Sequence, residues 1–227
     1  MISIVIPTYN EAENIERLIP QIFLLLKDSG IEGEVIVVDD NSPDGTAAIA
    51  RDLSRKYPVR VLQRPAKLGL SSAVLDGFRH ARGDILGVMD ADLSHDVTKL
   101  PHMVYSLKDY DLVIGSRYVS GGGTRDWSKK RRLISKGATW LARPLTKVKD
   151  PMSGFFVLKR SVIEGVELSP RGYKIGLEIL TKGRDARIKE IPYIFRDRKN
   201  GQSKMNRKEV LNYIFHLGKL YRHRIRK

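Results

Sequence analysis

Short apolar runs alternate with longer amphipathic stretches through the first half of this chain. The runs are rich in β-branched residues, which is typical of strands buried in a sheet. The stretches between them carry apolar residues three or four positions apart, as amphipathic helices do. Strands are predicted at 2–6, 34–38, 59–63, 84–89 and 112–116, and helices at 11–27, 44–57, 70–81 and 97–108. This βαβα order predicts a mostly parallel, Rossmann-like α/β sheet with helices on both faces.

The second half of the chain is less regular. A helix is predicted at 131–143, a strand at 155–159 and another helix at 175–181. Residues 188–195 are predicted to form an edge strand, because Pro192 cannot donate a hydrogen bond to a neighbouring strand.

Residues 206–225 form a predicted amphipathic helix at the end of the chain. Its apolar stripe consists of Val210, Ile214, Leu217 and Tyr221. This stripe either packs on the core or lies on a bilayer, with basic residues toward anionic headgroups. We therefore expect a catalytic domain over 1–205 and a basic interfacial helix over 206–227. The catalytic domain is expected to divide into a nucleotide and metal half, 1–118, and an acceptor half, 119–205.

Polar residues follow four of the predicted strands at the point where each strand ends. Right-handed crossovers bring the carboxyl ends of parallel strands to the same edge of a sheet. These segments are therefore expected to line one crevice, where open α/β sheets bind their ligands. They are Thr8-Tyr9-Asn10-Glu11, Asp39-Asp40, Asp90-Ala91-Asp92 and Gly115-Ser116-Arg117.

The pair Asp90 and Asp92 is the strongest chemical signal in the sequence. Strand residues alternate faces, so carboxylates two positions apart point to the same side of the chain. Such a pair suits Mg²⁺ or Mn²⁺, which keep open positions for substrate phosphates. The alternative is a solvated acidic turn; the position at the end of a central strand favours the metal site.

Several classes of site are excluded by what the sequence lacks. No GxGxxG follows the first strand and no Walker lysine motif occurs, which argues against a dinucleotide or P-loop site. The chain has no cysteine, so disulfides and thiolate metal sites are excluded. No apolar stretch reaches the length of about 18 residues that spans a bilayer, so no transmembrane helix is expected.

The net charge is +15, and its excess gathers in clusters at 129–132 and 219–227. Such clusters favour polyanionic partners: a nucleotide diphosphate, a lipid phosphate, an anionic membrane or nucleic acid. A basic surface that serves only solubility is the alternative. Nucleic acid is the least favoured partner, because the basic stretch RKNGQSKMNRK contains no aromatic residue for base stacking.

Seven motifs, in their order along the chain, resemble those of the family 2 glycosyltransferases. They are IVIPTYNEAENI, VIVVDDNSPDGT, KLGLSSAVLDGF, VMDADLSHD, GSRY, DPMSGFF and RKNGQSKM. Within that family the resemblance is strongest to the dolichol-phosphate mannose synthases. It implies a GT-A fold and transfer of mannose, with inversion, from GDP-mannose to dolichyl (polyprenyl) phosphate at the cytoplasmic face of a membrane. A UDP-glucose-dependent polyprenyl-phosphate glucosyltransferase of the same fold is the alternative.

The resemblance also assigns residues. It implies that the nucleotide is bound by Pro7, Tyr9, Glu11, Val38 and Asp40, and the metal and diphosphate by Asp90, Ala91, Asp92 and Ser94. Ser94 stands where some relatives have a glutamine, and because a hydroxyl reaches less far, a bridging water is its natural substitute. The phosphates are implied to contact Arg117, Arg131, Arg198 and Lys204. Asp92, Arg117 and Arg131 are the expected catalytic residues.

This set of residues agrees with the chemistry. A phosphate monoester has a second pKa near about 6, so the acceptor is already largely dianionic and a general base is dispensable. His95 is therefore expected to have a helix-start or structural role, and Trp127 and Trp140 to pack rather than stack on sugar. For Asp150 a simple turn and a functional role remain equally open. Peripheral membrane attachment through 219–227 is expected, with a second interfacial helix that carries Trp140 and Leu141. Attachment through a membrane-anchoring partner is the alternative.

Overall fold

The computed structural model describes residues 1–169, 174–196 and 207–225, and gives 207–210 by their backbone alone. Its centre is a seven-stranded sheet in the order β3-β2-β1-β4-β7-β5-β8. The strands are β1 Ile2–Thr8, β2 Gly33–Asp39, β3 Val59–Gln63, β4 Ile85–Val88, β5 Leu112–Ser116, β7 Phe156–Lys159 and β8 Ile188–Pro192. Strand β7 runs antiparallel to both of its neighbours, and the other pairings are parallel. The predicted mostly parallel sheet is confirmed.

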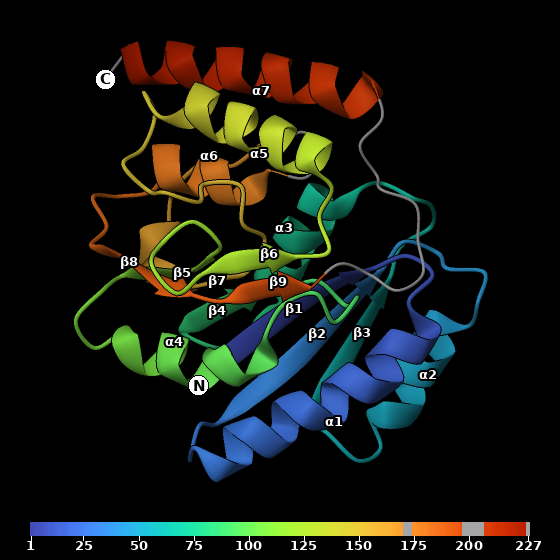
Figure 1. Cartoon of the computed structure of the whole chain (residues 1–227). Coiled ribbons are helices and arrows are strands. Elements are labelled where there is room, and N and C mark those ends of the chain that lie inside the picture. Colours follow the sequence, from blue (N-terminus) through green and yellow to red (C-terminus); the bar gives the residue numbers. More distant parts are fainter. Residues whose placement is uncertain (170–173, 197–206, 226–227) are drawn as a thin grey trace.

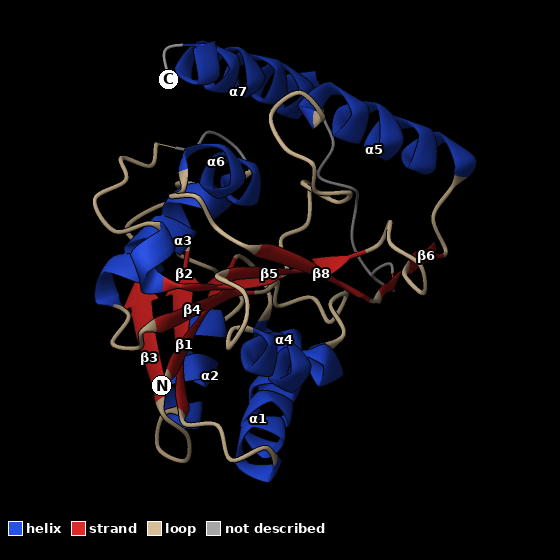
Figure 2. Ribbon diagram, turned by 90° about the vertical axis from the view of Figure 1, so that its left-hand side faces the viewer, coloured by secondary structure: helices blue, strands red, loops and turns tan. Residues whose placement is uncertain are grey.

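Helices cover both faces of this sheet (Figures 1 and 2). On one face lie α1 Ala12–Asp28, α2 Thr46–Leu53 and α4 Leu100–Ser106, with the short 3-10 turn Val97–Lys99 before α4. On the other face lie α3 Leu70–His80 and α6 Ile175–Lys182, with a second 3-10 turn at Arg160–Val162. Two further helices, α5 Lys129–Ala142 and α7 Arg207–Ile225, lie side by side beyond α6.

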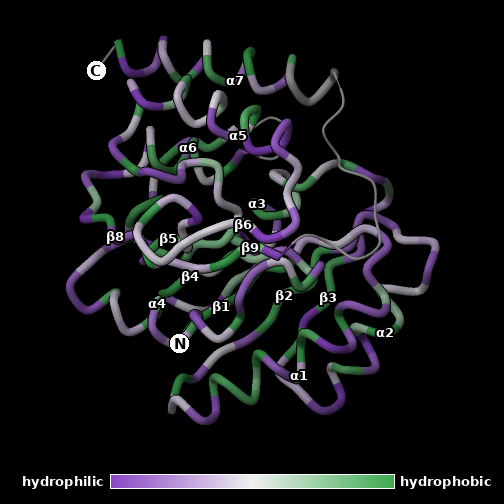
Figure 3. The backbone as a smooth tube through the Cα atoms, viewed as in Figure 1, coloured by the Kyte–Doolittle hydropathy of each residue, from purple (hydrophilic) through white to green (hydrophobic). Residues whose placement is uncertain are grey.

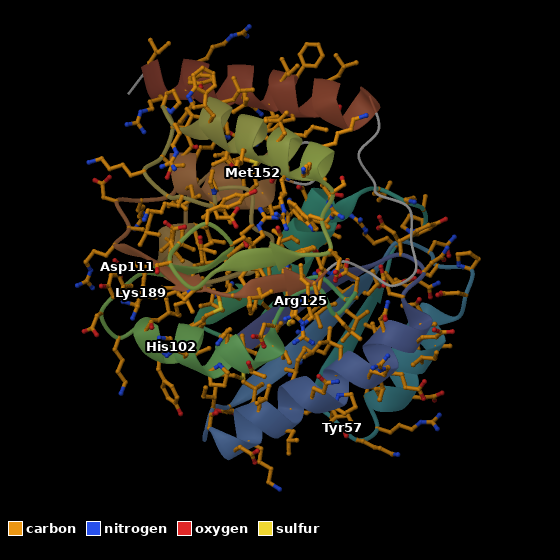
Figure 4. The ribbon with its side chains drawn as sticks, viewed as in Figure 1. Tyr57, His102, Asp111, Arg125, Met152 and Lys189 are labelled. Carbon is orange, nitrogen blue, oxygen red and sulfur yellow. The ribbon has the colours of Figure 1, made fainter. Side chains whose placement is uncertain are left out.

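Successive side chains along the strands point to opposite faces of the sheet and pack into two separate hydrophobic cores. In β1, Ile4 and Ile6 pack toward α1, whereas Val5 packs toward α3. The buried side of α1 includes Ile15 and Leu18, at the helical spacing that the sequence predicted. Figure 3 shows this pattern as hydrophobic segments in the central strands and alternating ones along the helices. Met152, labelled in Figure 4, belongs to a third, smaller core shared by α5, α6 and α7.

The edge strand predicted at 188–195 is divided in two. Its first part, β8, is indeed the edge of the main sheet and ends at Pro192. Proline has no N–H to donate on the open side of this edge strand, and the N–H of Tyr193 still donates 3.1 Å to the carbonyl of Ser116 in β5. The second part, β9 Ile194–Arg196, pairs in parallel with β6 Gly123–Arg125, which the sequence did not predict. This small second sheet carries Phe195 toward the polar edge of the main one.

The C-terminal helix is present, but the predicted stripe is only partly right. Leu217 and Leu220 are buried against α5 and α6, whereas Ile214 is 54% exposed. The hydroxyl of Tyr213 donates 2.6 Å to the carbonyl of Ala138 in α5, which fixes the rotation of the helix and turns Ile214 outward. No helix in the described ranges is long and apolar enough to cross a bilayer.

Candidate active site

The loop after β4 carries the acid pair. Asp92 is buried and Asp90 is partly exposed, and both belong to a tight turn at the carboxyl edge of the sheet. Leu93 has φ 59°, a left-handed conformation that is rare for a residue with a large side chain. This conformation folds the chain back so that the N–H of Ser94 donates 3.1 Å to Asp92 Oδ1. The backbone therefore fixes the Asp92 carboxylate.

His95 fixes the other acid. Its Nδ1 accepts a 3.0 Å hydrogen bond from the backbone N–H of Asp90, which leaves the ring proton on Nε2. That Nε2 lies 3.7 Å from Asp90 Oδ2. The ring stacks on Phe155 at 5.1 Å and meets Tyr193 and Phe195 edge-on. The structural role expected for His95 is confirmed, and it consists of holding the Asp90 end of the loop.

The acid loop fits a hard divalent cation. No group of three or more His, Cys, Asp or Glu side chains gathers anywhere in the described part of the chain. Mg²⁺ and Mn²⁺ do not require such a group, because they bind through one or two carboxylates, waters and substrate phosphates. The hydroxyl of Ser94 is buried beside Asp92 and has no hydrogen-bond partner among the described residues. A buried, unsatisfied oxygen in the loop of Asp90 and Asp92 is suited to a metal or to a metal-bound water.

The ends of β1 and β2 form a second polar region. Asp40 is buried, and both of its oxygens are engaged: Arg64 Nε donates 2.6 Å to Oδ1 and the N–H of Gly69 donates 2.9 Å to Oδ2. Beside it the ammonium of Lys67 lies 3.6 Å from the centre of the Tyr9 ring. Asp40 therefore braces the loop after β3 at the place where the nucleotide is expected.

A buried ion pair occupies the end of β5. Arg117 donates to Asp150 from Nε at 2.7 Å and from Nη2 at 2.6 Å, and its backbone N–H donates to the same carboxylate at 2.9 Å. Burial alone would lower the pKa of Arg117, but the hydrogen bonds and the charge of Asp150 outweigh it and raise the pKa. Arg117 is therefore permanently charged and fixed in orientation.

Aromatic rings connect the two charged regions. The guanidinium of Arg131 lies 4.3 Å from the centre of the Trp127 ring, and that of Arg117 lies 5.3 Å from it. Trp127 in turn meets Phe195, which touches His95. The acid pair and the two arginines thus lie on either side of one aromatic cluster. Packing of Trp127 is confirmed, but Trp140 is 73% exposed on α5 and does not pack as predicted.

The structure brings most of the expected site residues to one edge of the sheet. They are Pro7 in β1, Tyr9 and Glu11 after β1, Val38 in β2, Asp40 after β2, Asp90, Ala91, Asp92 and Ser94 after β4, Arg117 after β5 and Arg131 on α5. Arg198 and Lys204 lie outside the described residues. From the sequence alone the role of Asp150 stayed open and Arg64 and Lys67 had no predicted role, although the motif KLGLSSAVLDGF begins at Lys67.

Known proteins resemble this chain in sequence. The profile of the glycosyl transferase family 2 matches residues 3–166. A protein of Pyrococcus furiosus named dolichol-phosphate mannosyltransferase is 46% identical over 224 residues, which are 96% of this chain and 63% of the relative. One of Saccharomyces cerevisiae with the same name is 40% identical over 96% of this chain and 86% of the relative. The chain thus spans less than two thirds of the Pyrococcus relative's length.

Solved structures resemble it in fold. The mannosyltransferase PcManGT of Pyrobaculum calidifontis, in complex with GDP-Man and Mn²⁺, has a TM-score of 0.64 at 19% identity and covers 100% of this chain and 64% of that one. Glucosyl-3-phosphoglycerate synthase of Mycobacterium tuberculosis, in complex with Mn²⁺ and UDP, has a TM-score of 0.68 at 24% identity and covers 99% of this chain and 77% of that one. These likenesses confirm the predicted GT-A fold.

Proposed function

Because this chain belongs to glycosyl transferase family 2, we propose that it transfers mannose from GDP-mannose to dolichyl phosphate, with inversion at the anomeric carbon. The observation that carries the proposal is the placement of Asp90 and Asp92 across one aromatic cluster from Arg117 and Arg131. Relatives named for mannosyl transfer to dolichol phosphate favour this reaction over the glucosyl alternative and over nucleic-acid binding.

The donor is proposed to lie along the edge from β2 to β4. Tyr9 and Glu11, after β1, take the guanine and ribose together with Pro7, Val38 and Asp40. The diphosphate then reaches the loop of Asp90 and Asp92, which would hold Mg²⁺ or Mn²⁺ with Ser94 directly or through a water. A bound divalent cation supplies charge neutralisation for the departing diphosphate. The loop itself contributes two carboxylates whose orientation is set by His95 and by the N–H of Ser94.

The acceptor phosphate is proposed to bind on the arginine side. Among the hydrogen bonds of the described residues none engages Nη1 of Arg117, so this nitrogen can donate to a phosphate oxygen while Asp150 holds Nε and Nη2. Arg131, on the face of Trp127, can supply a second planar donor. Arg198 and Lys204 are proposed to complete this pocket. The arginines screen the repulsion between the two phosphates.

The reaction needs no base from the protein in this proposal. A dianionic phosphate oxygen of the acceptor attacks the anomeric carbon, the bond to the GDP oxygen breaks, and GDP leaves with the electron pair. Placement of the two phosphates on opposite sides of the sugar gives inversion and a β-linked product. The contribution of the protein is orientation and a fixed positive field at the acceptor side.

The chain is proposed to bind peripherally to the cytoplasmic face of a membrane. Large apolar side chains are exposed on α5 and α7, two helices on the same side of the sheet (Figure 2). They are Leu133, Ile134, Trp140 and Leu141 on α5, and Leu211, Ile214, Phe215 and Ile225 on α7. Basic residues, including Lys130 and Lys136, accompany them on α5, as expected for helices that lie on anionic lipid. A membrane-anchoring partner would bind at the same helices.

A donor-depletion assay tests the proposed activity. The protein, Mn²⁺ and dolichyl phosphate are mixed with either GDP-mannose or UDP-glucose, and the loss of each donor is followed. Loss of GDP-mannose alone, abolished in the Asp92→Ala variant, is the expected result. Preferential loss of UDP-glucose, or undiminished activity of the Asp92→Ala protein, would contradict the assignment.

A further inference from the structure

Lys67 is held in an unusual position for an exposed lysine. It belongs to the loop between β3 and α3, and its ammonium lies 3.6 Å from the centre of the Tyr9 ring, over the ring face. Such a cation–π contact gives this ammonium a preferred position even though the lysine is exposed. Tyr9 follows β1, and strands β4 and β7 separate β1 from β5, the strand that Arg117 follows.

Hydrogen bonds to Asp40 and across its own ends hold the loop that carries Lys67, residues 64–69. Arg64, at its start, donates 2.6 Å to Asp40 and 2.8 Å to the carbonyl of Gly69, at its end. The N–H of Gly69 donates 2.9 Å to the other oxygen of Asp40. Gly69 has φ 100°, a conformation that side chains rarely adopt, so the loop closes only because this residue is glycine. A surface loop that served only solubility would not require this brace.

An ammonium at this point offers hydrogen-bond donors where the expected nucleotide offers acceptors. Guanine presents two adjacent acceptors, O6 and N7, whereas adenine replaces O6 by an amino donor. Uracil, a single smaller ring, presents only O4 on the corresponding edge. The carboxylate of Glu11, two residues after Tyr9, offers the complementary acceptor for the N–H groups of guanine.

We propose that Lys67 recognises the O6/N7 edge of the guanine base and thereby selects GDP-linked donors over those of adenine and uracil. This inference rests on the proposed function, since it assumes that the base lies beside Tyr9. It adds a specificity residue, held in place by Asp40 and Arg64, to the expected nucleotide site.

Calorimetric titration with GDP, ADP and UDP in the presence of Mn²⁺ tests the inference without requiring turnover. Lys67→Met keeps the length of the side chain and removes the donors, and should weaken GDP binding about tenfold while leaving ADP and UDP within about twofold. Lys67→Arg should restore most of the GDP affinity, because arginine donates to both O6 and N7. Lys108→Met, an exposed lysine after α4, is the matched control and should bind all three nucleotides as the wild type does.

The outcomes separate this inference from the function on which it rests. Equal weakening for the three nucleotides would mean that Lys67 contacts phosphate or ribose and would overturn the inference. Unchanged or tighter GDP binding by Lys67→Met would overturn it as well. If the wild type binds no GDP at all, the proposed function fails and the inference fails with it.

Discussion

Arg117 and Asp150 form a buried ion pair joined at three points, two through the guanidinium and one through the backbone N–H. The side chain of Asp150 has no exposed surface, and that of Arg117 has 8%. A charge this deeply buried is tolerated only with its partner in place. The pair therefore ties the end of β5 to the segment before β7, and it also fixes the arginine that the proposed mechanism uses.

Removal of either partner is predicted to destabilise the fold. Asp150→Ala and Arg117→Ala should each lower the free energy of unfolding by about 3–5 kcal/mol, because an uncompensated charge is left buried. Urea unfolding followed by circular dichroism measures this. The double variant Arg117→Met with Asp150→Leu should recover most of the stability but none of the activity. Recovery of activity in the double variant would exclude Arg117 from substrate contact.

Loss of the Ser94 hydroxyl should weaken metal binding without lowering the stability of the metal-free protein. Because this hydroxyl is buried without a partner among the described residues, Ser94→Ala should leave the metal-free protein equally stable or up to about 1 kcal/mol more stable. Mn²⁺ affinity in the presence of GDP, measured by electron paramagnetic resonance, should fall. An unchanged affinity would show that the metal is bound without Ser94.

The exposed apolar residues of α5 should be required for membrane binding. Trp140→Ser is predicted to reduce association with vesicles that contain anionic lipid, because a large interfacial ring is lost. Leu24→Ser is the matched control, since Leu24 is 60% exposed but lies on α1, on the opposite face of the sheet. Vesicle co-sedimentation measures both variants. Equal losses for the two variants would argue against an α5 contact.

Tyr193 should make the protein sensitive to alkaline pH. Burial raises the pKa of its hydroxyl, although the positive charge of Arg117 opposes the shift. Above about pH 10 the unfolded chain ionises first, so the folded state loses stability as the pH rises. Above that pH, the free energy of unfolding of Tyr193→Phe should rise relative to that of the wild type by up to about 1.4 kcal/mol per pH unit. Near neutrality the difference in unfolding free energy between the two proteins should not change with pH. Parallel stability curves at all pH values would contradict the burial of this hydroxyl.

The periodic half of the chain could be predicted because each element there follows a local rule. β3 and β5 begin and end at the predicted residues, and the acid pair was found because it directly follows an apolar strand. The small sheet of β6 and β9 could not be predicted, since three-residue strands leave no periodic pattern and pair only through tertiary contacts. Residues such as Asp150 and Lys67 show their partners only once distant segments meet.

The rotation of α7 was missed for a similar reason. Apolar residues occur around most of this helix, so spacing alone does not say which side meets the core. The hydrogen bonds of Tyr213 to Ala138 and of Arg224 to Leu145 decide it, and both partners lie on or just after α5. The apolar residues left outside are those proposed to meet the membrane.

The most direct measurement is the structure of the product formed from GDP-mannose and dolichyl phosphate in the presence of Mn²⁺. Mass spectrometry and the anomeric proton–carbon coupling in nuclear magnetic resonance identify the lipid and its linkage. We expect a β-linked dolichyl mannosyl phosphate and one GDP released for each mannose transferred. An α-linked product, or free mannose in place of the lipid-linked sugar, would contradict it.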